Sequence, residues 1–164
     1  MTTRLLALRW LALVSLSVWF GGFTFYSAIV IPALHDAMGG VEAGRVTGEV
    51  SNSLNAFGVG AVAAWWWLAA VERSTGDRRA RRARVALLAA TTAILLGLVA
   101  LHPVMDARLE SGSLRGFYPL HKVYLIASTF QWGLNLALPA VSLWIWRGET
   151  GRAGGQMWTD SPSP

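Results

Sequence analysis

The chain has 164 residues, of which 54% are hydrophobic and 14% are charged, and its formal net charge is +5. Ordinary soluble domains contain roughly 25% charged residues, so this composition excludes a soluble fold and favours one small integral membrane domain. The absence of cysteine from the sequence excludes disulfides and cysteine-based metal or redox sites.

The first apolar run covers residues 10–31 and follows two basic residues, Arg4 and Arg9. As a helix this run would extend roughly 33 Å, enough to cross a hydrocarbon core about 30 Å thick. A basic start followed by an apolar run also resembles a signal peptide, but the apolar part of a signal peptide has only about 7–15 residues. We therefore expect an uncleaved membrane helix that ends before Pro32.

Three more apolar runs predict helices at residues 55–71, 85–101 and 123–146. Residues 32–50 contain a proline and four glycines, so we expect a loop there. The second run closes on three consecutive tryptophans, whose amphipathic rings suit the headgroup level of a bilayer. Residues 148–164 are rich in Gly, Ser and Pro, and we expect them to form a disordered cytoplasmic tail.

Basic residues are unevenly shared between the two sides that four crossings would create. Ten lie before the first run, between the second and third, or after the fourth, and four lie in the other two loops. Because short cytoplasmic loops carry the excess of Lys and Arg, both termini are predicted to be cytoplasmic. The six arginines of residues 72–84 also suit nucleic acid, but a short basic loop between apolar runs is typical of a cytoplasmic anchor.

The sequence thus predicts an all-α fold: an integral four-helix bundle of a bacterial inner membrane, with N-in, C-in topology. Its expected partners are the lipid bilayer and either a second copy or another membrane protein, with no nucleic acid. A purely structural or assembly subunit is also compatible with this architecture. No phosphate-binding loop, nucleophile elbow or zinc-protease motif occurs, so an enzyme is not the favoured interpretation. No ionisable residue lies in the middle of a predicted helix, which disfavours proton- or ion-coupled transport.

Polar residues gather near the predicted extracytoplasmic side and along the fourth run. Gln131 and Asn135 are four residues apart, so they share one face of a helix. Together with polar residues at the other helix ends, they predict a pocket that holds a small molecule, a lipid or a partner helix. The candidate ligand-binding residues are Asn52, Asn55, Asp106, Arg108, His121, Gln131 and Asn135.

The three histidines, His35, His102 and His121, all fall near the same predicted side. If their helices are neighbours, His102 and His121 would be able to reach a shared haem or divalent metal, since helix axes lie about 8–10 Å apart. The alternative function is therefore a haem- or metal-binding redox protein. Histidines at helix ends are also common as plain interface residues, and the favoured interpretation needs no cofactor.

Several motifs resemble a bacterial four-helix membrane family of unknown function that is related to eukaryotic transmembrane protein 205. They are Trp19-Phe-Gly-Gly-Phe-Thr-Phe-Tyr26 with Ile31-Pro32, His102-Pro-Val-Met-Asp-Ala-Arg108, Phe117-Tyr-Pro-Leu-His121, and Gln131-Trp-Gly-Leu-Asn135. The resemblance implies the fold and topology, but no reaction or cofactor, and it points to Gly21, Gly22, Pro32, Pro103, Arg108 and His121. The chain has a lesser resemblance to the small four-helix haem-linked oxidases of porphyrin synthesis. Histidines at helix ends would suit axial ligation of a haem.

Overall fold

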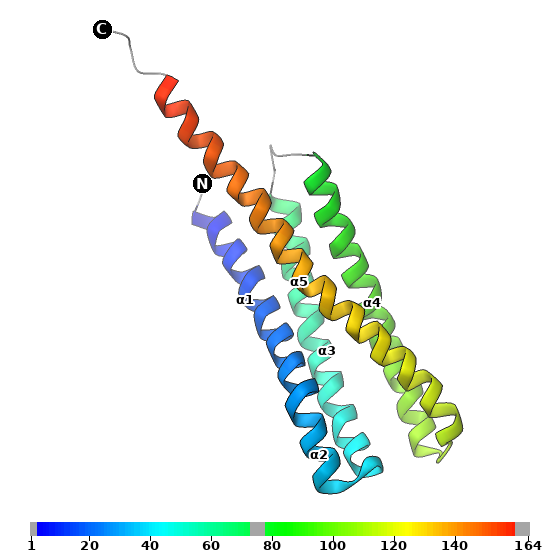
Figure 1. Cartoon of the computed structure of the whole chain (residues 1–164). Helices are drawn as coiled ribbons and strands as arrows, with labels where there is room; N and C mark the ends of the chain where they lie inside the picture. Colours follow the sequence, from blue (N-terminus) through cyan, green and yellow to red (C-terminus); the bar gives the residue numbers. More distant parts are fainter. Residues whose placement is uncertain (1–2, 73–77, 160–164) are drawn as a thin grey trace.

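A computed structural model describes residues 3–72 and 78–159, which are helical almost throughout. Thr3–Phe25 (α1), the π-helix Tyr26–Val30 (η1) and Ile31–Met38 (α2) follow one another as one long rod. Gly40–Val71 (α3), Arg78–Glu110 (α4) and Leu114–Thr159 (α5) form the other rods of this part of the chain. Neighbouring rods run in alternating directions, and the described starts of α1 and α4 lie at the same end as the end of α3 (Figure 1).

Within the described residues, the helices long and apolar enough to cross a membrane are residues 3–38, 42–71 and 78–110. The protein is therefore a helical membrane protein by length and composition. The remaining rod, α5, is long enough, but its apolar run is interrupted by amide side chains such as Gln131 and Asn135. Both amides are buried, so α5 turns this polar side toward the other helices.

The four rods pack around a shared interior. Along α4 and α5 the buried residues follow one another at alternating spacings of three and four residues. Along α4 the buried positions are Arg84, Leu88, Thr91, Leu95, Leu98, His102 and Met105. On α5 they include Tyr124, Ser128, Gln131, Asn135, Leu138, Ser142 and Ile145. This spacing keeps one seam of each helix facing its partner, as in coiled coils and helix bundles. The interior is mixed in character, because both seams contain apolar and polar side chains.

Helix α1 packs closely against α3 at Gly58. A Cβ atom built on Gly58 would lie 2.5 Å from ring atoms of Trp19, which is 3% exposed. The missing side chain therefore lets the indole of α1 lie against the α3 backbone, as small residues do at membrane helix contacts. On the other side of α1, Trp132 of α5 donates from Nε1 to Thr24 Oγ1 at 3.0 Å.

The expected loop at residues 32–50 was wrong. The structure has helix through most of it, and the chain turns at Gly39, whose φ of 80° favours glycine. Pro32 lies in the first turn of α2, directly after the π-helix η1, and the rod continues past it. The helices are accordingly longer than the apolar runs, because polar and small residues continue them beyond the apolar stretch.

At the other turn, α4 continues to Glu110 and α5 begins at Leu114, so the turn is much shorter than the expected loop of residues 102–122. Pro103 and Pro119 both lie inside helices. The α5 helix also continues to Thr159, past Trp146 where we expected it to end and into the segment expected to be disordered. Residues 160–164 of that segment lie outside the described residues.

Candidate functional site

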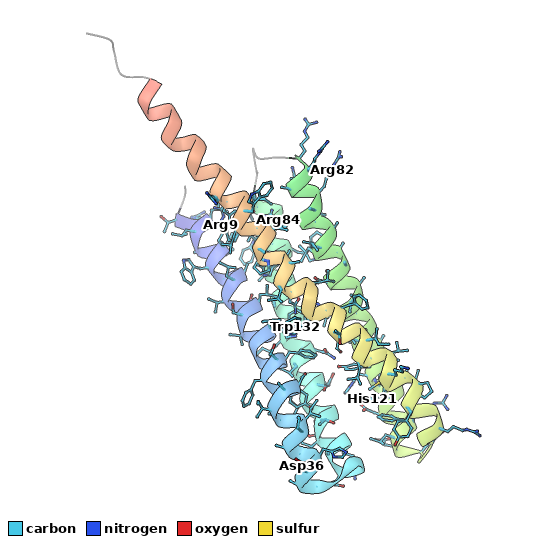
Figure 2. The ribbon with its side chains drawn as sticks, in the orientation of Figure 1. Arg9, Asp36, Arg82, Arg84, His121 and Trp132 are labelled. Carbon is cyan, nitrogen blue, oxygen red and sulfur yellow. The ribbon has the colours of Figure 1, made fainter. Side chains whose placement is uncertain are left out.

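Several residues of the interior form two clusters of polar contacts, one toward each end of the rods. We call Gly48, Asn55, His102, Asp106 and Tyr124 the distal cluster, because it lies in the half of the molecule that contains the α2–α3 and α4–α5 turns. We call Arg9, Glu72, Arg84 and Trp146 the proximal cluster, which lies near the start of α1 and α4. Figure 2 labels Arg9 and Arg84 at this end, among the helices.

His102 is the centre of the distal cluster. Its Nε2 lies 2.9 Å from the carbonyl oxygen of Gly48 on α3 and 3.6 Å from Asp106 Oδ2, one turn along α4. A carbonyl only accepts, so Nε2 carries the proton, and the buried Nδ1 has no hydrogen-bond partner among the described residues. A Cβ built on Gly48 would lie 3.4 Å from Asp106 Oδ1 and 4.0 Å from His102 Nε2, so the α3 backbone approaches both side chains here.

Tyr124 brings α5 to the same place. Its hydroxyl accepts a hydrogen bond of 3.3 Å from Asn55 Nδ2, and its ring centroid lies 6.0 Å from that of His102. Asn55, His102 and Tyr124 are all buried, whereas the Asp106 side chain is 48% exposed. The cluster therefore joins three helices and opens to the surface at the Asp106 carboxylate.

The other residues of the predicted pocket lie elsewhere. Asn52 is exposed on α3, and Arg108 is exposed on α4, with its side chain near Gly116 of α5. Gln131 and Asn135 are buried deeper along α5, where Gln131 Nε2 donates to Asn135 Oδ1 at 3.3 Å. Within the described part of the chain, Gln131 Oε1 has no hydrogen-bond partner. The structure thus brings Asn55 and Asp106 into one cluster, joined by His102 and Tyr124, but not all seven predicted residues.

The histidines have separate surroundings. His35 is exposed on α2. His121 stacks on Phe117 within α5, at 5.3 Å between ring centroids, and its Nδ1 is buried without a partner. Burial lowers the pKa of His121. Across residues 3–72 and 78–159, no group of three or more His, Cys, Asp or Glu side chains is placed to hold a metal ion.

The proximal cluster contains charged groups that are almost fully buried. Glu72 Oε1 accepts hydrogen bonds from Arg9 Nε and from Trp146 Nε1, each at 2.8 Å, and also contacts Arg9 Nη2. Its Oε2 accepts from Arg84 Nη1. Arg9 also lies over the Trp146 ring, 4.7 Å from the centroid, which suits a cation–π contact. One carboxylate therefore ties together all four rods: α1, the end of α3, α4 and α5.

Sequence reasoning missed this cluster, because Arg9 and Arg84 were counted only as topology signals. The signal that would have found these arginines is their helical spacing from the buried residues of the same helix. Arg9 precedes the buried positions Ala12, Leu16 and Trp19 of α1, and Arg84 precedes Leu88 and Thr91 of α4, each in steps of three or four. An arginine on the buried seam of a helix needs an acidic partner, and Glu72 follows directly after α3.

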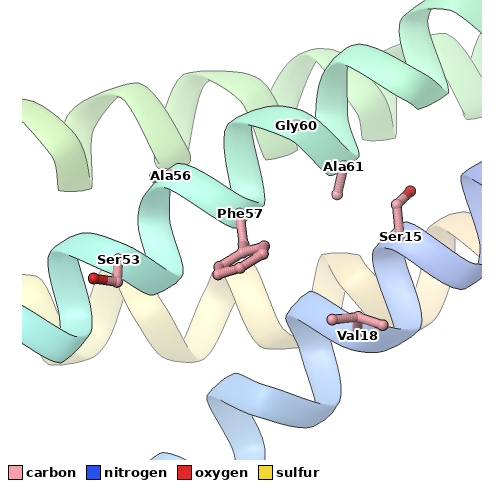
Figure 3. A pocket seen from close by; sticks show the side chains of 7 residues that line it. All are labelled: Ser15, Val18, Ser53, Ala56, Phe57, Gly60 and Ala61. Carbon is pink, nitrogen blue, oxygen red and sulfur yellow. The ribbon is translucent and has the colours of Figure 1, made fainter.

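A groove of about 630 Å³ lies away from both clusters, on the outer side of α1 and α3 (Figure 3). Its lining is small or apolar: Ser15, Val18, Ser53, Ala56, Phe57, Gly60 and Ala61. The Ser15 and Ser53 hydroxyls donate to carbonyls of their own helices, so they offer the groove little unsatisfied polarity. The groove suits an apolar chain or helix better than a polar ligand.

Comparison with protein families matches residues 14–112 to the domain of unknown function DUF4149. The chain belongs to this family. The DUF4149 match runs from within α1 to the α4–α5 turn, so it contains Gly48, Asn55, His102 and Asp106 of the distal cluster but not Tyr124. Of the proximal cluster it contains Glu72 and Arg84. The comparisons with curated proteins and with solved structures found no match.

Proposed function

We propose that this DUF4149 protein crosses a bacterial inner membrane four times, with both termini in the cytoplasm. On this proposal it binds a small molecule at the extracytoplasmic end, over the distal cluster. The distribution of basic residues supports the orientation, because ten lie on the proximal side and four on the distal side. The buried polar seam of α5 supports a fourth crossing, since its amides and hydroxyls are turned away from lipid.

The observation that carries the binding proposal is the unsatisfied polarity around His102. A buried imidazole nitrogen without a partner is costly in a membrane interior, and binding of a hydrogen-bonding group would offset that cost. The neighbouring Asp106 carboxylate is half exposed and only accepts hydrogen bonds when it is ionised. These two groups together favour a small molecule that carries hydrogen-bond donors, such as an amine or a polyol.

This proposal is tested by a thermal-shift screen of the purified, detergent-solubilised chain against small primary amines, quaternary ammonium compounds and polyols. We expect compounds with N–H or O–H donors to raise the unfolding temperature of the wild type and to lose that effect in Asp106→Asn. Glu110→Gln, which removes another carboxylate of α4, is the matched control and should respond as the wild type does. Equal responses of wild type and Asp106→Asn to every compound would contradict binding at the distal cluster.

We also infer a relation to eukaryotic transmembrane protein 205. The motifs around Trp19–Tyr26, His102–Arg108 and Phe117–His121 support it. Two of these motifs contribute to helix contacts, through Trp19 against Gly58 and His102 against Gly48. This relation would imply the same fold and four membrane crossings for this chain. It would not imply a reaction.

A further inference from the structure

Among the basic residues of the proximal end, two sets have different surroundings. Arg9 and Arg84 turn inward and bind Glu72. Arg78, Arg81 and Arg82, in the first turns of α4, are exposed. In Figure 2 Arg82 extends beyond the packed helices, while Arg84 lies among them. The outward set does not take part in the Glu72 cluster, so its charge faces the surroundings of the protein.

The outward arginines, Arg78, Arg81 and Arg82, lie at the N-terminal end of an apolar face of α4. Steps of three and four residues along α4 lead from Arg78 and Arg82 to Val85, Ala89 and Leu96, which therefore share one side of the helix. All three of these apolar residues are exposed, Val85 by 38% and Leu96 by 59%. Because α4 is long and apolar enough to cross a membrane, this face lies against lipid with the arginines at its end.

A tryptophan from α3 borders this face. Trp66 Nε1 donates to Thr92 Oγ1 at 3.0 Å, and Thr92 occupies the turn between Ala89 and Leu96. The indole is 38% exposed, so part of it remains available for contact. A cation cluster followed by an apolar stripe matches the headgroup and the acyl chains of a lipid, and the indole borders this stripe between Ala89 and Leu96.

We propose that the start of α4 binds the headgroup of an anionic phospholipid, with its acyl chains along Val85, Ala89 and Leu96. Charge complementarity selects this occupant over a zwitterionic lipid, because the three arginines have positive charge and the first turn of a helix adds a partial positive charge. The apolar stripe selects a lipid over free phosphate. This site is at the opposite end from the distal cluster and does not depend on a ligand there.

The test titrates the purified full-length chain, in a neutral detergent, with dioleoylphosphatidylglycerol and separately with dioleoylphosphatidylcholine, and counts bound lipids by native mass spectrometry. The wild type should bind the anionic lipid more tightly. In R78Q/R81Q/R82Q this affinity should fall by about a hundredfold, since each arginine near an anionic surface contributes roughly fivefold. The matched control R45Q/R115Q/K122Q removes three exposed charges at the distal end and should stay within about threefold of wild type.

Equal losses in both triple variants, or no loss in either, would overturn the proposal, because the preference would then be diffuse or absent. If R78Q/R81Q/R82Q does not fold, the salt dependence of lipid binding by the wild type tests the proposal. Raising salt from about 0.05 M to 0.5 M should weaken binding of the anionic lipid and leave that of the zwitterionic lipid unchanged. Identical salt responses would contradict a headgroup site.

Two competitors separate the other occupants. Glycerol 3-phosphate, which has the charge without the chains, should not displace the anionic lipid at equal concentration, and displacement would mean that the site recognises phosphate alone. A duplex oligonucleotide is the second competitor. If R78Q/R81Q/R82Q loses oligonucleotide binding but keeps the lipid preference, the arginines serve nucleic acid and the proposal fails.

Discussion

At the scale of single residues, Glu72 has the most consequential surroundings in the described part of the chain. Its side chain is 2% exposed and contacts two buried guanidinium groups and an indole N–H. Moving charges out of water is costly, and the cost is offset only when the partners are close and hydrogen-bonded. The cluster therefore depends on Glu72: removing this carboxylate leaves the buried Arg9 and Arg84 without its negative charge.

Replacing Glu72 with glutamine should destabilise the fold strongly. Glutamine keeps the volume but removes the negative charge, and its amide would direct N–H groups at arginines that also donate. Loss of one partner from a buried ion pair costs about 3–5 kcal/mol. We expect a decrease of this size in the free energy of unfolding, measured by denaturant titration of the protein in detergent.

The matched control is Glu110→Gln, because Glu110 is exposed at the end of α4. An exposed charge contributes little, so this variant should unfold within about 0.5 kcal/mol of the wild type. If both variants unfold alike, the Glu72 contacts do not hold the helices together.

His121 should make the stability of the fold depend on pH in a predictable direction. Burial lowers the pKa of His121, so the folded state releases a proton that the unfolded state still holds. Stability is then unaffected above the ordinary histidine pKa of about 6.5 and falls as pH drops below it toward the lowered pKa. His121→Gln should lose less stability than the wild type between pH 7 and pH 5, measured by thermal unfolding. A steeper loss in the variant would contradict this sign.

Individual side-chain roles were only partly predictable from the sequence. Helical spacing correctly placed Gln131 and Asn135 on one face, where they hydrogen-bond each other. It did not indicate that His102 would reach the carbonyl of Gly48, because that contact depends on how closely α3 and α4 approach. The Arg9–Glu72 pair joins residues far apart in the chain, and hydropathy alone does not show which charges turn inward.

At the scale of helices, the contact between α1 and α3 depends on one missing side chain. Gly58→Ala should destabilise the protein by about 1–3 kcal/mol, because the added methyl group would overlap the Trp19 ring and force the two helices apart. Unfolding in detergent, followed by Trp fluorescence, measures this change.

Gly60→Ala is the control for this prediction. Gly60 lies two residues further along α3, and a Cβ there meets nothing within 4 Å. Alanine is also the better helix former, so this variant should be neutral or slightly more stable. A loss for Gly60→Ala as large as that for Gly58→Ala would show that helix packing at Trp19 is not the cause.

The helix boundaries show why local patterns misled at the turns. Proline and glycine at residues 32–50 suggested a loop, yet only Gly39 turns the chain, since Pro32 lies in the first turn of α2. Apolar runs report only the part of a helix that lies in lipid. They therefore do not show how far Glu42–Ser51 or Met105–Glu110 continue a helix beyond it.

For the whole molecule, the sequence predicted the all-helical membrane architecture, because its four apolar runs carry no charged side chain and three of the resulting helices are long and apolar enough to cross a membrane. The fourth run, residues 123–146, was predicted to cross as well, and that prediction rests on α5 hiding its amides from lipid. The proposed orientation rests on the distribution of basic residues alone. The structure adds that the two turns of the distal half lie at one end and Glu72, with the described starts of α1 and α4, at the other (Figure 1).

The most direct measurement is the location of reporters fused at three places: the α4–α5 turn at residues 111–113, the segment 73–77, and the C-terminus. Four crossings with cytoplasmic termini predict an extracytoplasmic reporter at the α4–α5 turn and cytoplasmic reporters at the other two places. An extracytoplasmic C-terminus beside a cytoplasmic segment 73–77 would leave three crossings, and the account of α5 and of the distal site would be contradicted.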